Sequence, residues 1–167
     1  GITGAPFDSF LTLRGLRTLH ARIRLHEENA SALVSLLCGH PAVSKVHYPG
    51  LTSHPGHEIA VSQQRGFGGM ISFELQGSQQ QAGVFLNSLK FFSLAESLGG
   101  VESLVAHPAS MSHAAMGPEG RRLAGISDKL IRLSVGIENV EDLLADLKAG
   151  LDKILAAQST SARAEAL

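Results

Sequence analysis

The sequence predicts an α/β domain of the α+β kind, in which a mixed or antiparallel sheet is covered by helices and preceded by a long connecting helix. Two observations support this prediction. Alternating apolar positions typical of strands recur along the chain, and stretches with helical periodicity separate them. Before them, residues 6–38 carry helical periodicity alone. The length of 167 residues, of which 44% are hydrophobic, suits one domain with a buried core.

The composition excludes several classes of protein. The chain has 14 Lys and Arg residues against 15 Asp and Glu residues, so it offers no broad basic surface for nucleic acid. No stretch reaches the ~18 apolar residues that a membrane-spanning helix requires, and no signal-peptide pattern is present. The single cysteine, Cys38, cannot form an internal disulfide. We therefore expect a cytoplasmic protein that binds neither nucleic acid nor membrane.

Residues 6–38 predict one long helix or two abutting helices, with Gly15 as the expected weak point. Pro6 is typical of a first helical turn and Gly39 of a helix end. In the second half, the spacing of mostly apolar side chains predicts a buried face made of Leu19, Ile23, His26, Ala30, Leu33 and Leu37. We expect residues 1–40 to be a connecting segment with a long interdomain helix, and residues 41–155 to be the C-terminal α/β domain.

Beyond this segment, strands and helices alternate. Apolar alternation and flanking glycines predict strands at residues 42–48, 70–75, 91–95, 101–107 and 129–135. Apolar spacing and helix-start residues predict helices at residues 79–90, 118–125 and 139–155. The remaining segments are expected to be loops at 51–57 and 108–117 and a flexible tail at 156–167.

Arg132 is the most informative polar residue. The run 130–135 alternates, so that Ile131 and Leu133 point to one face of a strand and Arg132 to the other. An arginine in so apolar a strand needs a partner, and its planar guanidinium matches a carboxylate or phosphate, bound through two hydrogen bonds. The alternative is an internal salt bridge, or a stem that lies over the sheet with its head in water.

A glycine pair, Gly99-Gly100, interrupts the chain between two predicted strands. Such a break lets backbone N–H groups point into a cavity, and it places Glu96 and Ser97 at a strand end, where ligands often bind. An ordinary turn or bulge is the alternative, and composition alone favours it.

The histidines do not predict a metal site. His54, His57 and Glu58 lie in and after a Pro-Gly turn, and their spacing is not that of a helical zinc motif. His107 and His113 are the other pair considered. Cys38, near the end of an apolar helix face, is expected to pack in the core rather than act as a nucleophile.

A series of motifs resembles, in order, the C-terminal part of the pyridoxal-phosphate enzymes of cysteine and methionine metabolism. The motifs occupy residues 7–10, 13–19, 48–51, 66–75, 94–104, 125–128 and 131–138. The resemblance covers residues 1 to about 155, and several long motifs in the right order make a chance match unlikely. It implies the small C-terminal domain of a fold-type I pyridoxal-phosphate enzyme.

Within this family, the resemblance is to the gamma-synthase branch. It implies that the acyl group of an O-acyl-L-homoserine, expected to be the O-succinyl ester, is replaced by L-cysteine to give cystathionine in methionine biosynthesis. Arg132 would bind the substrate α-carboxylate, with Ser97 and its backbone orienting that carboxylate. Glu96 would face the distal part of the substrates. Ser112 stands where the family usually has threonine, so the hydroxyl is kept and a methyl group is lost.

The resemblance also implies what lies outside the chain. The lysine that binds the cofactor would lie upstream, so we expect no catalytic residue within these residues, and no pyridoxal 5'-phosphate bound by the chain alone. The implied partners are the substrates, an N-terminal cofactor-binding domain of the same enzyme, and further copies in a homotetramer. The alternatives are a cystathionine gamma-lyase or homoserine sulfhydrylase of the same family, or a non-enzymatic amino-acid-binding α/β module.

Overall fold

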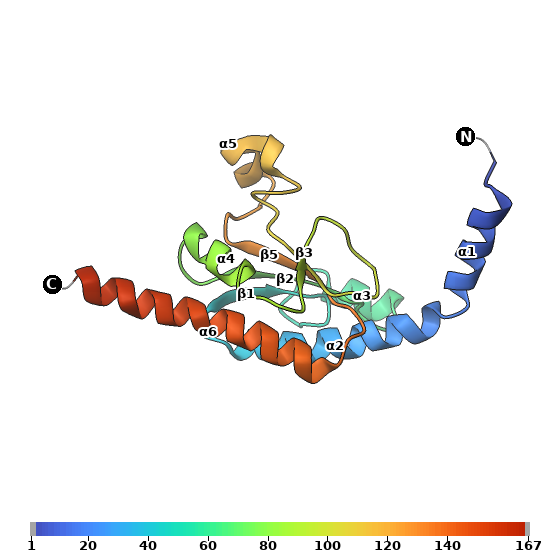
Figure 1. Ribbon diagram of the computed structural model, residues 1–167, viewed down its shortest axis with the longest axis horizontal. Helices are drawn as coiled ribbons and strands as arrows, with labels where there is room; N and C mark the ends of the chain where they lie inside the picture. Colours follow the sequence, from blue (N-terminus) through green and yellow to red (C-terminus); the bar gives the residue numbers. More distant parts are fainter. Residues whose placement is uncertain (1–2, 166–167) are drawn as a thin grey trace.

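The computed structural model describes residues 3–165. Its centre is a five-stranded sheet in the order β1-β2-β5-β4-β3 (Figure 1). The strands are β1 (Val43–His47), β2 (Met70–Leu75), β3 (Ser93–Leu94), β4 (Leu104–Ala106) and β5 (Leu130–Ser134). Neighbouring strands run antiparallel, apart from β3 and β4, which are parallel. The predicted α/β fold with a mixed sheet is confirmed.

Helices lie mainly on one side of this sheet. They are α1 (Pro6–Leu16), α2 (Leu19–Gly39), α3 (His57–Gln63), α4 (Gln79–Leu86), α5 (Gly117–Leu123) and α6 (Val140–Glu165), with the short 3-10 helix η1 (Ala114–Met116) before α5. Helices α2 and α6 run along one side of the sheet, and α5 lies on the other side (Figure 1). In the described part of the chain, no helix is long and apolar enough to cross a membrane.

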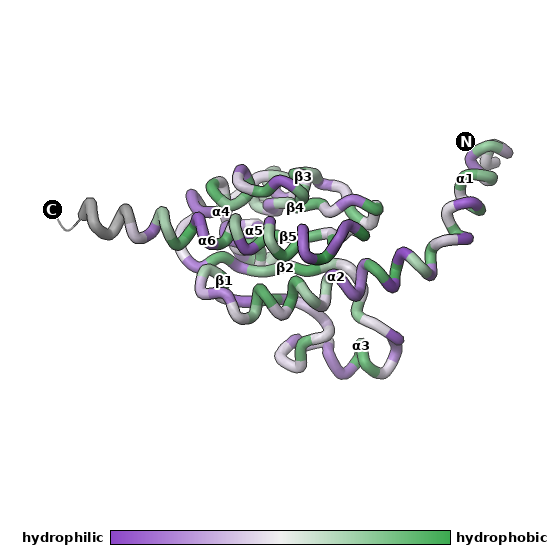
Figure 2. The backbone as a smooth tube through the Cα atoms, turned by 60° about the horizontal axis from the view of Figure 1, so that its bottom comes forward, coloured by the Kyte–Doolittle hydropathy of each residue, from purple (hydrophilic) through white to green (hydrophobic). Residues whose placement is uncertain are grey.

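Residues 6–39 form two helices, which is one of the two arrangements that the sequence predicts. The break falls at residues 17–18, just after Gly15. Helix α1 buries no residue and extends away from the sheet, although it carries several hydrophobic positions (Figure 2). The predicted burial of Leu19 and Ile23 is wrong, since these side chains are 39% and 46% exposed. The first turns of α2 lie beyond the sheet, and burial begins at His26.

The central strands show the alternation that the sequence predicts. In β2 the exposure of successive side chains alternates along the whole strand, with Phe73 fully buried between half-buried Ser72 and Glu74. Ser72 pairs with Arg132 of β5, and Phe73 pairs with Ile131. The sheet therefore has one apolar face toward α2 and α6 and one polar face that carries Arg132.

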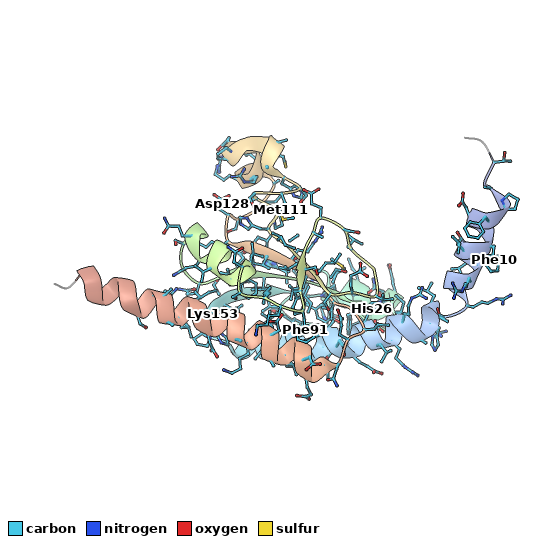
Figure 3. All side chains as sticks on the ribbon, in the orientation of Figure 1. Phe10, His26, Phe91, Met111, Asp128 and Lys153 are labelled. Atoms are coloured by element: carbon cyan, nitrogen blue, oxygen red, sulfur yellow. The ribbon has the colours of Figure 1, made fainter. Side chains whose placement is uncertain are left out.

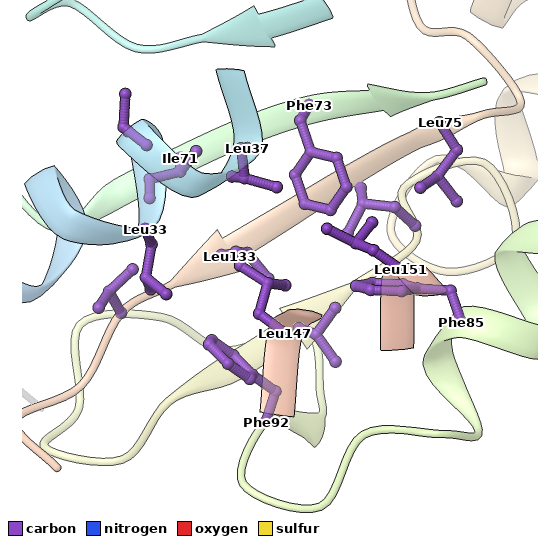
Figure 4. Close-up of a cluster of buried hydrophobic side chains, with 14 of the residues drawn as sticks. Leu33, Leu37, Ile71, Phe73, Leu75, Phe85, Phe92, Leu133, Leu147 and Leu151 are labelled. Carbon is purple, nitrogen blue, oxygen red and sulfur yellow. The ribbon is translucent and has the colours of Figure 1, made fainter. Parts of the chain in front are cut away.

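The apolar face forms the core together with helices α2, α4 and α6. The ring of Phe73 in β2 meets that of Phe85 in α4 edge-on, with 5.8 Å between the ring centres (Figure 4). Leucines at helical spacing complete the packing from both long helices, with Leu33 and Leu37 from α2 and Leu143, Leu147 and Leu151 from α6. Because these helices pack against the sheet, they hold its strands in position. The side chains on the opposite, polar face are thereby held in position as well.

Several element boundaries differ from the prediction. Helix α3 occupies residues where no helix is expected, and η1 lies within the expected loop at 108–117. Strands β3 and β4 are shorter than predicted, because the glycine-containing segment between them does not pair. Helix α6 continues to Glu165 instead of ending near Leu155, because the small and polar residues beyond it still favour a helix.

Helix α4 ends at Leu86 instead of continuing to residue 90, and a carboxylate from α6 explains why. Asp146, 7% exposed, accepts hydrogen bonds from the backbone N–H groups of Lys90 and Phe91, at 2.9–3.0 Å and 2.9 Å respectively. If the helix continued, these N–H groups would donate to carbonyls of the helix itself. The charged acceptor instead holds them in the turn that leads into β3.

An ion pair on α6 makes stability depend on pH. The Lys148 ammonium, 2.6 Å from the Asp152 carboxylate, holds the pKa of Asp152 below its ordinary value of 3.8, and His40 adds to the effect. A lowered folded-state pKa stabilises the fold at pH values above the ordinary value, and this contribution is lost as pH falls through the lowered pKa. Since both side chains are about half exposed, we expect Lys148→Met to cost only about 0.5 kcal/mol at neutral pH.

Urea unfolding at pH 7 and at pH 2.5 measures this effect. The difference in unfolding free energy between wild type and Lys148→Met should shrink at the lower pH. Lys153→Met is the control, because Lys153 makes no ion pair within residues 3–159 and should show no such trend. An equal cost of Lys148→Met at both pH values would contradict the assignment.

Candidate functional site

Arg132 lies on β5, on the sheet face opposite to α2 and α6, as the alternation predicts. Its Nη2 atom donates hydrogen bonds to the backbone carbonyls of Glu96 at 2.7 Å and of Ser97 at 3.2 Å. No salt bridge joins it to a carboxylate in the described part of the chain. The guanidinium is therefore held in place by neutral groups, and its positive charge is available to an outside anion.

The guanidinium of Arg132 keeps hydrogen-bond donors that a carboxylate can use. Both hydrogen bonds of Arg132 leave from Nη2, while Nε and Nη1 donate to no described residue. These two nitrogens lie on opposite edges of the planar group, so a carboxylate can approach either edge, where it meets the positive charge and one of these donors. The internal salt bridge considered as an alternative is therefore not found among the described residues.

Glu96 and Ser97 lie beside Arg132, but they contact it through their backbone carbonyls. Both side chains are exposed. Their carboxylate and hydroxyl thus remain available to a ligand that lies against Arg132. The structure brings three of the four predicted residues, Arg132, Glu96 and Ser97, into one contact group.

Ser112 is the fourth predicted residue, and it lies apart from this group. It is in the segment between β4 and η1, is exposed, and its hydroxyl shares a hydrogen bond of 2.8 Å with Nδ1 of His113. Met111, beside it in the chain, lies on the same side of the sheet as Asp128 and α5 (Figure 3). No hydrogen bond links Ser112 to Arg132 in the described chain.

His107 fixes the base of the segment that carries Ser112. It is 4% exposed, its Nδ1 lies 2.7 Å from the Ser110 hydroxyl, and its Nε2 donates to the backbone carbonyl of Asp128 at 2.9 Å. Both ring nitrogens are therefore used within the fold. This histidine holds a loop, and it has no free nitrogen for a metal.

Ser134 is a residue of this site that the sequence analysis did not single out. Its Oγ accepts a hydrogen bond of 2.9 Å from the backbone N–H of Gly99, and its side chain is on the same face of β5 as Arg132. The signal was present in the sequence, because alternation places residues 132 and 134 on one face of a strand. What the alternation could not predict is that Gly99 would fold back onto this hydroxyl.

A second unpredicted group joins the other end of the same segment to the chain after β5. The Glu138 carboxylate accepts hydrogen bonds from the Ser103 N–H at 2.6 Å and from the Ser103 hydroxyl at 2.9 Å. The Ser103 hydroxyl oxygen in turn accepts a hydrogen bond from the Gly136 N–H at 2.8 Å. This buried group has its hydrogen bonds satisfied, and it fixes residues 101–103 against residues 136–138.

Other candidates from the sequence do not form sites. Within residues 3–159, no group of three or more His, Cys, Asp and Glu side chains could hold a metal ion. Cys38 is exposed, so its predicted core packing is wrong. It lines a shallow groove of about 540 Å³ between the end of α2 and β1, away from Arg132.

A comparison with protein families matches residues 1–152 to the model described as "Cys/Met metabolism PLP-dependent enzyme". Among curated proteins, cystathionine gamma-synthase of Escherichia coli (strain K12) is 56% identical over 150 residues, which are 90% of this chain and 39% of that protein. Cystathionine gamma-lyase of Dictyostelium discoideum is 55% identical over 153 residues, which are 92% of this chain and 40% of that protein. The chain thus spans about two fifths of the length of these relatives.

Among solved structures, a cystathionine gamma synthase from Xanthomonas oryzae pv. oryzae, in complex with aminoacrylate and cysteine, has the same fold. The TM-score is 0.88 at 62% sequence identity, and the match covers 93% of this chain and 40% of that one. A family model that matches nearly the whole chain agrees with this structural likeness. The chain therefore belongs to the pyridoxal-phosphate-dependent enzymes of cysteine and methionine metabolism.

Proposed function

We propose that this chain forms the substrate-carboxylate side of a cystathionine gamma-synthase. The observation that carries the proposal is the guanidinium of Arg132, which neutral carbonyls hold through Nη2 while Nε and Nη1 stay available. An amino-acid substrate presents an α-carboxylate, which the positive charge and these remaining donors can bind. The names of the E. coli and X. oryzae relatives support the synthase assignment.

In the proposed reaction, L-cysteine replaces the acyl group of an O-acyl-L-homoserine, and cystathionine is formed. Pyridoxal phosphate, when bound in the full-length protein, supplies the electron sink for chemistry at the substrate carbons. The residues of this chain bind and orient. Arg132 fixes the α-carboxylate, the Ser97 hydroxyl lies beside it, and the exposed Glu96 carboxylate faces the more distant part of the substrate.

The described residues suit the substrate better than the cofactor. The five lysines are Lys45, Lys90, Lys129, Lys148 and Lys153. Lys148 and Lys153 lie on α6, behind the other face of the sheet, and Lys45 is on β1, two strands from β5. Lys90 is in the turn that Asp146 of α6 holds, and Lys129 directly precedes β5. None of the five stands in the Ser/Thr-rich motif that the family's cofactor lysine occupies. We therefore propose that the cofactor-binding lysine belongs to a part of the full-length protein outside this chain, and that this chain alone is inactive.

Two assays test the proposal. The full-length protein should form cystathionine from O-succinyl-L-homoserine and L-cysteine, whereas the purified 167-residue chain should not. Borohydride reduction of the chain mixed with pyridoxal phosphate should leave no specific lysine adduct, as detected by peptide mass spectrometry. A reduced adduct at one lysine together with turnover by the chain alone would contradict the proposal.

Cystathionine gamma-lyase is the second candidate, because the Dictyostelium gamma-lyase is almost as similar as the E. coli synthase. The full-length protein given cystathionine alone decides between them. Rapid release of cysteine, with slow use of the acylated homoserine, would establish the lyase. In both reactions Arg132 has the same carboxylate to bind, so its proposed role does not depend on the choice.

A further inference from the structure

We propose that Ser134 is a positioning residue for Arg132. It acts by holding residues 96–100 against the guanidinium through the N–H of Gly99. This inference rests on the proposed function, because it concerns how well Arg132 is placed to bind a substrate carboxylate. In this proposal Ser134 contributes to substrate binding without contacting the substrate itself.

The geometry of Ser134 suits this role. The side chain is 2% exposed and belongs to the same strand and the same face as Arg132. Its hydroxyl oxygen lies 2.9 Å from the backbone nitrogen of Gly99, which has a φ of +78°. A side chain at residue 99 would be strained in that conformation. The positive φ and the serine hydroxyl together fix one path for the segment.

The same short segment fastens Arg132. Two and three residues before Gly99, the carbonyls of Ser97 and Glu96 accept the hydrogen bonds of Nη2. Arg132, the carbonyls, Gly99 and Ser134 therefore form a closed ring of contacts that begins and ends on β5. If the Gly99 bond to β5 is lost, the two carbonyls lose a fixed position and the guanidinium loses its orientation.

Both ends of the segment are anchored, and the Gly99–Ser134 bond lies between them. At the near end, the backbone N–H of Ala95 donates to the carbonyl of Val105 at 3.0 Å. The backbone N–H of Ile137 donates to the carbonyl of Val101 at 2.9 Å. A methyl group at Gly136 would lie 2.5 Å from that same carbonyl oxygen, so only glycine permits this close approach. With residues 95 and 101–103 fixed in this way, the Gly99–Ser134 bond ties the middle of the segment to β5, next to the carbonyls that hold Arg132.

A further anchor ties this region to the body of the domain. The side-chain amide of Asn29, 6% exposed on α2, donates to the carbonyls of Gly136 at 3.0 Å and Glu138 at 2.9 Å. Removing the Ser134 hydroxyl therefore leaves the fold and the outer anchors in place. The expected defect is in binding the carboxylate, not in folding.

A double-mutant cycle in the full-length holoenzyme tests this inference. The variants are Ser134→Ala, Arg132→Ala and the double variant, assayed for cystathionine formation. Ser134→Ala should lower kcat/KM about tenfold, mainly through a higher KM for the acylated homoserine, because one hydrogen bond is lost. In the Arg132→Ala background the same change should lower kcat/KM less than about twofold, since there is no guanidinium left to position.

A matched control and a conservative variant complete the design. Ser44→Ala removes another strand hydroxyl, which donates to a neighbouring strand at 3.1 Å but lies at the β1 edge of the sheet. It should leave kcat/KM unchanged. Ser134→Thr keeps the hydroxyl and should recover most of the activity. Inhibition by L-2-aminobutyrate, which keeps the α-carboxylate but has no leaving group, should weaken in Ser134→Ala, while inhibition by propylamine, which lacks the carboxylate, should not change.

The outcomes separate this inference from the proposed function. If Arg132→Ala lowers kcat/KM steeply while Ser134→Ala does not, the positioning role fails and the carboxylate site stands. If Ser134→Ala costs the same factor in both backgrounds, or lowers kcat with KM unchanged, the inference is also overturned. If Arg132→Ala itself has no effect on kcat/KM, the proposed carboxylate site fails and the inference fails with it.

Discussion

Replacing Arg132 with alanine should lower kcat/KM of the full-length protein between about 30-fold and about 5,000-fold. Removing one partner of a charge pair that is buried on binding costs about 2–5 kcal/mol, because the carboxylate is left without its counter-charge. The kcat/KM of Arg132→Lys should fall between those of the wild type and Arg132→Ala, since an ammonium keeps the charge but lacks the planar set of donors. Steady-state kinetics with the acylated homoserine and cysteine measures both effects.

A loss of folding must be separated from a loss of binding in this experiment. Arg132 also donates to the carbonyls of residues 96 and 97, so its removal loosens that segment. Added guanidinium ion should restore part of the activity of Arg132→Ala if the site is intact. Arg24→Ala is the control, because Arg24 forms an exposed pair with Glu28 on α2. A lower unfolding free energy with unchanged kcat/KM would show that Arg132 is a structural residue.

Asp146→Ala should reduce the unfolding free energy of the chain by about 3 kcal/mol. The carboxylate is 7% exposed and accepts the N–H groups of Lys90 and Phe91. Each hydrogen bond to a charged acceptor contributes about 1.5–3 kcal/mol, and alanine offers no replacement. Chemical denaturation monitored by circular dichroism gives the value directly.

Asp142→Ala is the matched control for this substitution. Asp142 lies on the same helix, in its exposed first turn, and its removal should cost no more than about 0.5 kcal/mol through the helix dipole. The loss of unfolding free energy in Asp146→Asn should lie between the losses in Asp142→Ala and Asp146→Ala, because one amide oxygen remains as an acceptor. Equal effects of the two alanine substitutions would show that the contacts of Asp146 with residues 90 and 91 add little stability.

Three of the four candidate site residues that lie together could be predicted, because their signal is local. An arginine in an apolar strand stands out by alternation, and a glycine pair marks a turn at a strand end. Arg132, Glu96 and Ser97 were therefore identified before any tertiary contact was known. The contact between them was not part of the prediction: the backbone carbonyls of residues 96 and 97 accept hydrogen bonds from the guanidinium.

The supporting residues were not predictable in the same way. Ser134, Asp146 and Glu138 are ordinary polar residues in sequence, and each becomes important only through a partner 35 to 56 residues away. The end of α4 shows the same limitation. Its apolar spacing continues to Leu89, but the carboxylate of Asp146 on α6 holds the next N–H groups, of residues 90 and 91, outside the helix.

The sequence by itself determined the strands, most of the helices, the polar face of β5 and the family, because these depend on periodicity and on motifs contiguous in the chain. Only the tertiary structure decided which carbonyls hold Arg132, where the segment 96–100 lies, and how far α2 is buried. These features depend on hydrogen bonds and packing between residues distant in the chain. Local propensity carries no information on such contacts until the sheet and its helices have brought the residues together.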